Sequence, residues 1–392
     1  MSLRRILLSV SLTLGLLCLA EPARAGAPKT TDKDAPKAAE KPRVEVVFCL
    51  DTTGSMGGLI DAAKKKIWSI SNQITTGKPT PQVKVGLVAF RDRGDEYITK
   101  VFDLTEDLDT VYTNLMGFRA DGGGDEPESV NQALFDAVHK ITWSKDKKVL
   151  KMIFLVGDAP PHMDYPDDVK YPETCKEAVK RDIIINTVLC GASESAKDHW
   201  LKICRAAEGS FVQIDAGGGP VVAFATPFDD ELAKINGEIS RSTLVFGRAD
   251  TRAKGKSLAK KGAELPAAEA ADRAAFYARG AGGGVAYDLL RNIETGAVKL
   301  ESLKDDELPD ELKGKTLDQK RAFLDKLGKD RKALSEKALD LDKKRNAFIA
   351  KKLAESEKTR ARDSFDANVL RILADQARRA RIEYAVEEEK KK

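Results

Sequence analysis

Asp51-Thr52-Thr53-Gly54-Ser55 is the stretch of sequence that decides the fold. It follows the apolar run 44–50 and opens a helical pattern near Met56. This order predicts a buried strand, a sharp turn and a helix. The first, third and fifth residues supply a carboxylate and two hydroxyls, and such oxygens suit a hard divalent cation, Mg²⁺ in particular. Because Ser and Thr also cap helices routinely, the five residues alone leave both interpretations open.

Two later segments carry the same kind of side chain. Residues 121–128, Asp-Gly-Gly-Gly-Asp-Glu-Pro-Glu, precede a helical pattern, and their three glycines allow the backbone to come close to an ion. Residues 157–162, Gly-Asp-Ala-Pro-Pro-His, follow the apolar run 152–156, which is another candidate for a buried strand. Three loops therefore each offer an aspartate or a hydroxyl at a strand end or before a helix, which favours a cation site.

Taken together, the three loops resemble the von Willebrand factor type A domain and its metal-ion-dependent adhesion site. That site uses Asp-x-Ser-x-Ser, a Thr after a Gly-rich stretch, and a later Asp. Asp51, Thr53 and Ser55 match the first element, with Thr in place of the first Ser. Asp158 matches the later Asp, whereas Asp125 stands where the family usually has Thr.

The resemblance covers residues 43–215 and implies an α/β fold with a doubly wound, mostly parallel sheet. The hydrophobic pattern agrees, because strand-like and helix-like segments alternate along this region. In the family's strand order, Asp51 and Asp158 follow neighbouring strands at a topological switch point, where open α/β sheets bind ligands. Strands are expected at 83–90, 100–104, 182–190 and 211–214, and helices at 55–74, 107–116, 128–141, 172–181 and 196–207.

The resemblance also implies a set of metal ligands. In the family the hydroxyls usually contact the metal, the carboxylates often act through water, and one position stays open for a carboxylate of the partner. The cation is expected to be Mg²⁺, with Mn²⁺ and Ca²⁺ left open. Since Asp125 adds a third negative charge, we expect a tighter hold on the metal and a weaker pull on an acidic partner. The predicted ligands are Asp51, Thr53, Ser55, Asp125 and Asp158.

Three more residues of these loops, Gly124, Glu126 and His162, are candidates for contact with the partner. His162 could contact the partner or orient a carboxylate, or it could be a loop histidine without a role, and these alternatives stay open. With three histidines in the chain and no His/Cys ligand spacing, we do not expect a zinc site.

The first 25 residues have the features of a bacterial signal peptide. Arg4 and Arg5 precede an apolar core at 6–20, and Ala23-Arg24-Ala25 provides a small-residue cleavage site. The core is short for a membrane span, so we expect a secreted or periplasmic protein with no stable span after signal removal. Of the four cysteines beyond the signal peptide, at least Cys49 is expected to stay unpaired.

Composition divides the rest of the chain. Residues 26–42 are predicted to be a disordered linker, and 216–300 a mixed, mostly helical connecting region. Residues 301–392 are predicted to be a charged helical arm, in which a helix over about 317–362 could form a hairpin with 363–384. Every seventh residue of this arm is apolar, but the opposite heptad positions are mostly charged, so a solvated arm is favoured over a self-associating coiled coil. The apolar positions are Leu327, Leu334, Leu341 and Phe348, and the opposite ones are Arg331, Ala338, Arg345 and Lys352.

Two classes of function remain. The first is an extracytoplasmic, metal-dependent protein-binding module, a scaffold or adhesin, which engages an Asp or Glu of a partner protein and is not an enzyme. The alternative is a metal-assisted hydrolase that uses the same loops, with Asp125 or His162 as the base, although no second acid or nucleophile is evident. A net charge of +4 offers no electrostatic case for nucleic acid.

Overall fold

A computed structural model of the chain describes residues 41–124, 126–217, 225–280, 287–355 and 364–384. The predicted signal peptide and the predicted ligand Asp125 lie outside the described residues. So does most of the glycine-rich stretch at 280–284.

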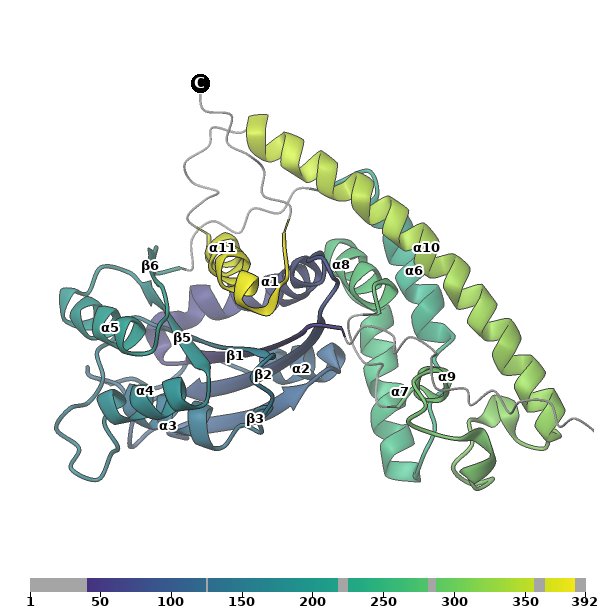
Figure 1. Cartoon of the computed structure of the whole chain (residues 1–392), viewed down its shortest axis with the longest axis horizontal. Helices are drawn as coiled ribbons and strands as arrows, with labels where there is room; N and C mark the ends of the chain where they lie inside the picture. Colours follow the sequence, from purple (N-terminus) through teal and green to yellow (C-terminus); the bar gives the residue numbers. More distant parts are fainter. Residues whose placement is uncertain (1–40, 125, 218–224, 281–286, 356–363, 385–392) are drawn as a thin grey trace, which may run out of the picture. The chain divides into compact units, whose positions relative to one another are not determined.

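Six strands form one sheet in the order β3-β2-β1-β4-β5-β6 (Figure 1). All neighbouring strands are parallel except β3, which runs antiparallel to β2 at one edge. The predicted α/β class with a mostly parallel sheet is therefore confirmed. The strands are β1 (Arg43–Asp51), β2 (Gln82–Phe90), β3 (Thr99–Thr105), β4 (Leu150–Gly157), β5 (Ile183–Cys190) and β6 (Phe211–Ile214).

Strands β1 and β4 lie at the centre of the sheet because they are mostly apolar on both faces, with Glu45, Asp51 and Lys151 as buried polar exceptions. Apart from Arg43 at the start of β1, both strands are buried along their whole length, as continuous apolar runs in a parallel sheet require. Leu50 pairs with Val156, so the two strands end side by side at the carboxyl-terminal end of the sheet, called here its carboxyl edge. The predicted neighbours β1 and β4 are thus confirmed, and the loops that follow them emerge side by side.

Helices cover both faces of the sheet. On one face α3 (Val130–His139), α4 (Tyr171–Lys180) and α5 (Glu194–Ala206) pack against side chains such as Val47 and Ile153. On the other face, α1 (Gly57–Ile74) and α2 (Leu108–Met116) pack against the alternate side chains of the same strands. The chain continues through α6 (Asp229–Arg241), α7 (Ala249–Ala263), α8 (Ala267–Ala278), α9 (Leu289–Glu294), α10 (Leu317–Glu355) and α11 (Phe365–Ala377).

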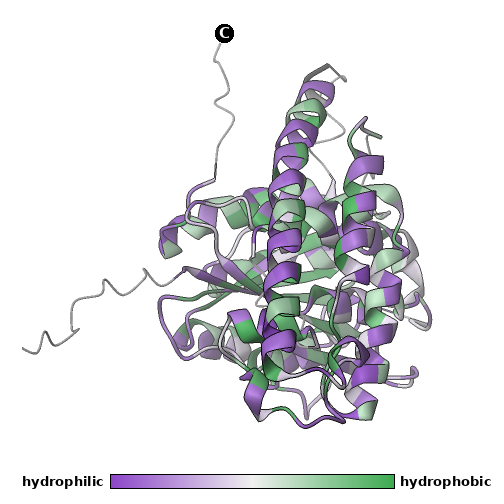
Figure 2. Ribbon diagram, turned by 90° about the vertical axis from the view of Figure 1, so that its right-hand side faces the viewer, coloured by the Kyte–Doolittle hydropathy of each residue, from purple (hydrophilic) through white to green (hydrophobic). Residues whose placement is uncertain are grey.

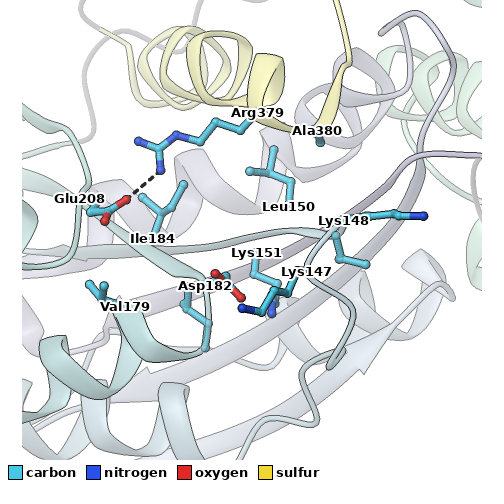
Figure 3. A pocket seen from close by; sticks show the side chains of 12 residues that line it. Lys147, Lys148, Leu150, Lys151, Val179, Asp182, Ile184, Glu208, Arg379 and Ala380 are labelled. Carbon is cyan, nitrogen blue, oxygen red and sulfur yellow. Dashed lines mark hydrogen bonds and ion pairs between the residues drawn. The ribbon is translucent and has the colours of Figure 1, made fainter.

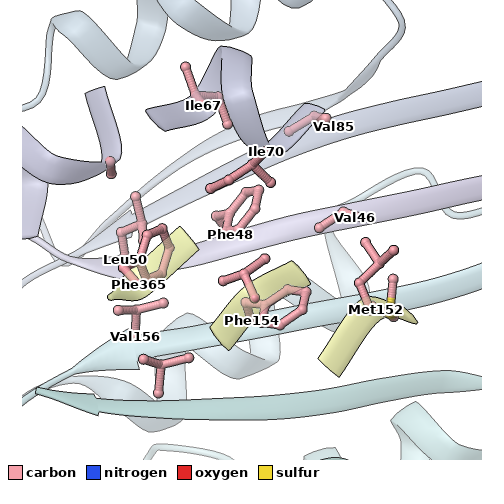
Figure 4. Close-up of a cluster of buried hydrophobic side chains, with 14 of the residues drawn as sticks. Val46, Phe48, Leu50, Ile67, Ile70, Val85, Met152, Phe154, Val156 and Phe365 are labelled. Carbon is pink, nitrogen blue, oxygen red and sulfur yellow. The ribbon is translucent and has the colours of Figure 1, made fainter. Parts of the chain in front are cut away.

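The last helix, α11, packs into the main core, and the expected hairpin with α10 was wrong. Its apolar face lies over the sheet beside α1 (Figure 1). The ring of Phe365 lies 6.2 Å from that of Phe48 in β1, inside the cluster drawn in Figure 4. The sheet offers a larger apolar surface than the charged α10, so burial of Phe365 and Ile372 is more favourable there.

Helix α10 is not a fully solvated arm. Ala338 and Leu341 are buried against α6 and α8, while its outward face is mainly hydrophilic, as the view from the side of α10 shows (Figure 2). The buried face also includes Arg345, which is 5% exposed. The prediction that the charged heptad positions face solvent was wrong for Arg345, because its partners are carboxylates of helices remote in sequence.

All four cysteines of the described residues are buried and free, which confirms the expectation for Cys49. Among the described residues, no helix has the length and apolar character needed to cross a membrane.

Candidate metal centre

Asp51 is the last residue of β1 and is almost fully buried, at 1% exposure. Its Oδ1 accepts hydrogen bonds from the backbone N–H of Thr53 (2.9 Å) and from the Thr53 hydroxyl (2.7 Å). Its Oδ2 is buried and has no hydrogen-bond partner among the described residues. One oxygen of this carboxylate is therefore engaged locally, and the other is left for a group that the protein chain does not supply.

The rest of the first loop turns through the short helix Gly54–Met56 into α1. The hydroxyls of Thr53 and Ser55 lie 3.4 Å apart; Thr53 is buried and Ser55 is exposed. Neither hydroxyl is used as a cap at the start of these helices. The capping interpretation of this stretch therefore has no support in the structure.

The second loop is joined to the first through its backbone. The Gly54 N–H donates to the Gly122 carbonyl (3.2 Å), and the Gly123 N–H is held by the carboxylate of Asp95 (3.2 and 3.3 Å). Gly122 and Gly123 both have positive φ, a conformation that glycine adopts without strain. A Cβ on Gly123 would lie 2.8 Å from the Thr53 Cβ, so a larger residue would not fit. Two of the three glycines thus allow the close approach expected of them.

The third loop follows β4 and brings Asp158 beside Asp51. A Cβ built on Gly157 would lie 3.0 Å from the Asp51 Oδ2, which shows how closely the two strand ends approach. Asp158 is half-buried. The Glu128 backbone links this loop to the second one, because its N–H donates to the Pro160 carbonyl (2.9 Å) and its carbonyl accepts from the His162 N–H (3.1 Å).

His162 contacts carboxylates rather than solvent. It is 6% exposed, its Nδ1 lies 2.7 Å from Asp164 Oδ1, and its Nε2 lies 3.3 Å from Asp92 Oδ2. Its ring stacks on Tyr165 with the centroids 3.8 Å apart. The other two candidates for partner contact, Gly124 and Glu126, are exposed.

The electrostatics of the site reflect burial first and neighbouring negative charge second. Burial, together with the charge of Asp158, raises the pKa of Asp51 to about 7 despite the hydrogen bonds from Thr53 and from the Asp158 backbone. Burial and the charges of Asp51, Asp92, Asp95 and Asp158 raise the pKa of Glu128 to about 9. Both shifts disfavour the ionised carboxylates, because no described side chain forms an ion pair with either of them.

Sequence reasoning missed three carboxylates of this cluster: Asp92, Asp95 and Glu128. Asp92 and Asp95 follow β2, whose end lies beside that of β1, so their position depended on the strand order. Asp92 accepts from the Ser129 hydroxyl (2.7 Å) and from the Tyr165 hydroxyl (2.9 Å), and thus ties three segments together. For Glu128, its place three residues after Asp125 in the glycine-rich string was the available signal.

The donor set fits a hard divalent cation. Asp51 has one buried carboxylate oxygen, Oδ2, without a partner, while its Oδ1 accepts from the Thr53 hydroxyl, which lies 3.4 Å from that of Ser55. Among the described residues, no three His, Cys, Asp or Glu side chains are grouped so that they could hold a metal ion by themselves. The predicted ligand set also includes the hydroxyls of Thr53 and Ser55, and Asp125, which lies outside the described residues.

Comparison with known proteins identifies the domain. The profile of the von Willebrand factor A domain matches residues 45–220, which include all three loops and the sheet apart from the first two residues of β1. The chain contains a von Willebrand factor A domain. Domains of this family are protein-interaction modules and are often metal-dependent.

Individual relatives match segments of 93 to 164 residues of the chain. The chain is 43% identical over 93 residues to von Willebrand factor A domain-containing protein 7 of Rattus norvegicus, and 42% identical to the Homo sapiens protein. These alignments cover 24% of this chain and 10% of each relative. A putative ariadne-like RING finger protein of Acanthamoeba polyphaga mimivirus is 26% identical over 164 residues, which is 41% of this chain and 14% of that protein.

Solved structures overlap with the domain only loosely. Proximal thread matrix protein 1 of the mussel byssus, with a zinc-occupied MIDAS motif, is 15% identical over 44% of this chain and 42% of its own, with a TM-score of 0.35. The SpRpn10 VWA domain is 15% identical over 44% of this chain and 88% of its own, with a TM-score of 0.34. Similarity at this level adds nothing to the assignment, which depends on the sequence profile and the strand order.

Proposed function

We propose that the protein is a cation-dependent protein-binding module that acts outside the cytoplasm, with Mg²⁺ as its cation. Asp51, Thr53, Ser55, Asp125 and Asp158 would hold the ion at the carboxyl edge of the sheet. The bound cation would supply an electrophilic coordination position for an Asp or Glu side chain of the partner. The predicted signal peptide is the basis for the location outside the cytoplasm.

The observation that carries this proposal is the buried Asp51 Oδ2, which has no partner among the described residues. Leaving a buried carboxylate oxygen without a partner costs about 1–3 kcal/mol or more. A turn that retains such an oxygen and also carries the hydroxyls of Thr53 and Ser55 is suited to a ligand, and a hard cation matches its chemistry. Ser55 and Glu126 are exposed, so a partner could reach the edge of the site.

A hydrolase is less well supported by the arrangement. The candidate base His162 is 6% exposed and stacks on Tyr165, so its buried Nε2 is not open to a substrate at the surface of the loops. A cavity of about 370 Å³ lies among α6, α8, α9 and α10, and one of about 190 Å³ lies at the opposite edge of the sheet (Figure 3). Neither is lined by residues of the three loops, where the base would have to act.

Cation titration of the purified protein tests the proposal. Isothermal calorimetry with MgCl₂, MnCl₂ and CaCl₂ is expected to show one site per chain, and Asp51→Asn should weaken binding at least 100-fold. Asp125→Thr, which introduces the usual family residue, should weaken cation binding less than Asp51→Asn. A surface variant far from the loops, Lys256→Ala, serves as the matched control. A wild-type protein that binds none of the three cations would contradict the proposed function.

Partner capture tests the second part of the proposal. Protein immobilised in Mg²⁺ should retain partners that are lost in chelator and absent from Asp51→Asn. Partners retained equally in all three conditions would show that they do not bind through the cation.

A further inference from the structure

The cavity of about 370 Å³ among α6, α8, α9 and α10 has the size of a small-molecule pocket (Figure 1). It reaches from solvent into the interior of the helical region. Lys332 and Glu294 in its lining are exposed, whereas Arg273 and Leu290 are only 4% and 5% exposed. Apolar side chains and a few polar groups line it together, which is the usual composition of a ligand pocket.

One face of α10 forms a wall of this cavity. Gly328, Arg331, Lys332 and Ser335 all line it. Their spacing of three, four and seven residues from the glycine places them on the same side of the helix. This wall therefore presents a guanidinium, an ammonium and a hydroxyl group beside a position that has no side chain.

Gly328 is the one glycine among the 39 residues of α10. A glycine in the interior of a helix is destabilising relative to alanine, so its presence calls for a reason. Packing does not give one, because a Cβ at this position would come no closer than 3.8 Å to Glu294 and 4.0 Å to Leu290. What the glycine does is to leave space in the wall of the cavity.

The charges of the lining leave one cation unmatched. Four cationic side chains of the described residues line the cavity, and carboxylates pair with three of them. The pairs are Arg273 with Asp109, Arg331 with Asp288, and Arg291 with Glu294. The fourth, Lys332, forms no ion pair or hydrogen bond with any described residue, and neither does the hydroxyl of Ser335 three residues further on. An ammonium and a hydroxyl on one helix face are suitable donors to an anionic group.

We propose that this cavity binds a small organic anion with an apolar body, such as an aliphatic or aromatic carboxylate. Lys332 and Ser335 would donate to the anionic group, and the apolar body would lie beside Ile239 and Leu290 in the space that Gly328 leaves open. Burial of the apolar body supplies the driving force, and the ammonium gives the preference for an anion over a neutral molecule. No residue named here belongs to the three loops, so this inference does not depend on the proposed function.

Calorimetric titration of the purified protein with sodium octanoate, sodium 1-naphthoate and the neutral 1-octanol tests the inference. Wild type is expected to bind a carboxylate at least tenfold more tightly than 1-octanol. Gly328→Leu fills the cavity with a better helix former, so it should melt no lower than wild type and bind at least tenfold more weakly. Lys332→Glu should also weaken carboxylate binding at least tenfold. Lys329→Glu makes the same charge change at an exposed position of α10 outside the lining, and should stay within twofold of wild type.

Four results would overturn the inference. They are a wild type that binds neither carboxylate at millimolar concentration, 1-octanol bound as tightly as octanoate, undiminished binding by a folded Gly328→Leu, and equal losses in Lys332→Glu and Lys329→Glu. Should Gly328→Leu not fold, as judged by circular dichroism, Ser335→Leu fills the cavity from the same helix face. It should show the same tenfold loss, and undiminished binding by this variant would place the ligand elsewhere.

Discussion

Two groups of buried carboxylates among the described residues are treated in opposite ways. Where the C-terminal helices pack on one another and on α2, buried aspartates are paired with arginines. Asp109 receives two hydrogen bonds of 2.7 Å from Arg273, and Arg345 bridges Asp229 (2.7 Å) and Asp272 (2.8 Å). Similar pairs join Arg279 to Asp342 and Arg331 to Asp288.

At the ends of β1 and β4, by contrast, Asp51, Asp158 and Glu128 form no ion pair with any described residue. The same protein therefore has the means to neutralise buried acids and does not use them at this edge of the sheet. Because an isolated buried charge is very costly, these carboxyl groups have raised pKa values, and on the proposed function a bound cation would supply the missing positive charge. The carboxylates among the helices hold the fold together through ion pairs, whereas those of the loops are the ones proposed to bind.

The largest expected effect comes from breaking a buried arginine–aspartate ion pair. Arg273→Met leaves Asp109 buried at 4% exposure without its cation, and should lower the free energy of unfolding by about 3–5 kcal/mol. Urea denaturation followed by circular dichroism measures the loss. The surface variant Lys256→Met, which breaks an exposed pair with Asp310, should cost no more than about 1 kcal/mol.

A double variant sharpens this first prediction. Arg273→Met combined with Asp109→Asn leaves no buried charge, and it should recover part of the stability lost in the single variant. A double variant less stable than Arg273→Met alone would show that the hydrogen bonds of Asp109 to Tyr277 and Tyr287, rather than its charge, determine the loss.

The second largest effect is expected when a divalent cation is added to the wild-type protein. A cation present at 100 times its dissociation constant should stabilise the wild type by about 2.7 kcal/mol relative to chelator. Asp51→Asn should show no such gain, yet in chelator it should be more stable than wild type because it removes an unpartnered buried carboxylate. Thermal melts with and without MgCl₂ measure both differences. Equal stabilisation of wild type and Asp51→Asn would place the cation elsewhere.

Much of the fold could be predicted from sequence, because the signals are local. Continuous apolar runs identified β1 and β4, and β6 was predicted at the residues it occupies, Phe211–Ile214. Asp51, Thr53 and Ser55 form a local motif on one turn, and the structure links their side chains in a chain of contacts of 2.7 and 3.4 Å. Signals within five residues of one another do not depend on how distant segments pack.

The rest depended on contacts between distant segments. Arg331 and Arg345 occupy heptad positions that suggest solvent, but they bind Asp288 and Asp272, which lie 43 and 73 residues away in sequence. Asp92 and Asp95 likewise join the site only once the strand order is known. A charged residue on a helix is compatible with either water or a buried partner, and only the tertiary structure distinguishes the two.

A smaller effect concerns the pH dependence of stability in chelator. The pKa of Glu128 is raised to about 9 in the folded state from 4.5, so between these values the folded protein binds more protons than the unfolded chain. Unfolding free energy should therefore fall as pH rises, by at most about 1.4 kcal/mol per pH unit from this group. Between pH 7.5 and 8.5 Asp51, with a pKa of about 7, has largely ionised, so Glu128 dominates the difference.

Comparing wild type with Glu128→Gln isolates this contribution, because every other titrating group is shared. Urea denaturation in chelator across that pH range should give a steeper decline for wild type than for the variant. Parallel slopes would mean that the Glu128 carboxyl group does not titrate in this range.

The smallest expected effect is at an ion pair between an arginine and a glutamate that, unlike the buried arginine–aspartate pairs, is exposed to solvent. Arg379 and Glu208 are 3.0 Å apart beside the cavity at the opposite edge of the sheet, with their side chains 54% and 59% exposed (Figure 3). Because water and salt screen this pair, Arg379→Ala should change the free energy of unfolding by about 0.5 kcal/mol or less. Denaturation at low and high salt measures it. A loss comparable to that of Arg273→Met would show that attachment of α11, rather than burial of charge, determines how much an arginine contributes to stability. A negligible loss would show that burial alone distinguishes the stabilising buried arginines from the exposed Arg379.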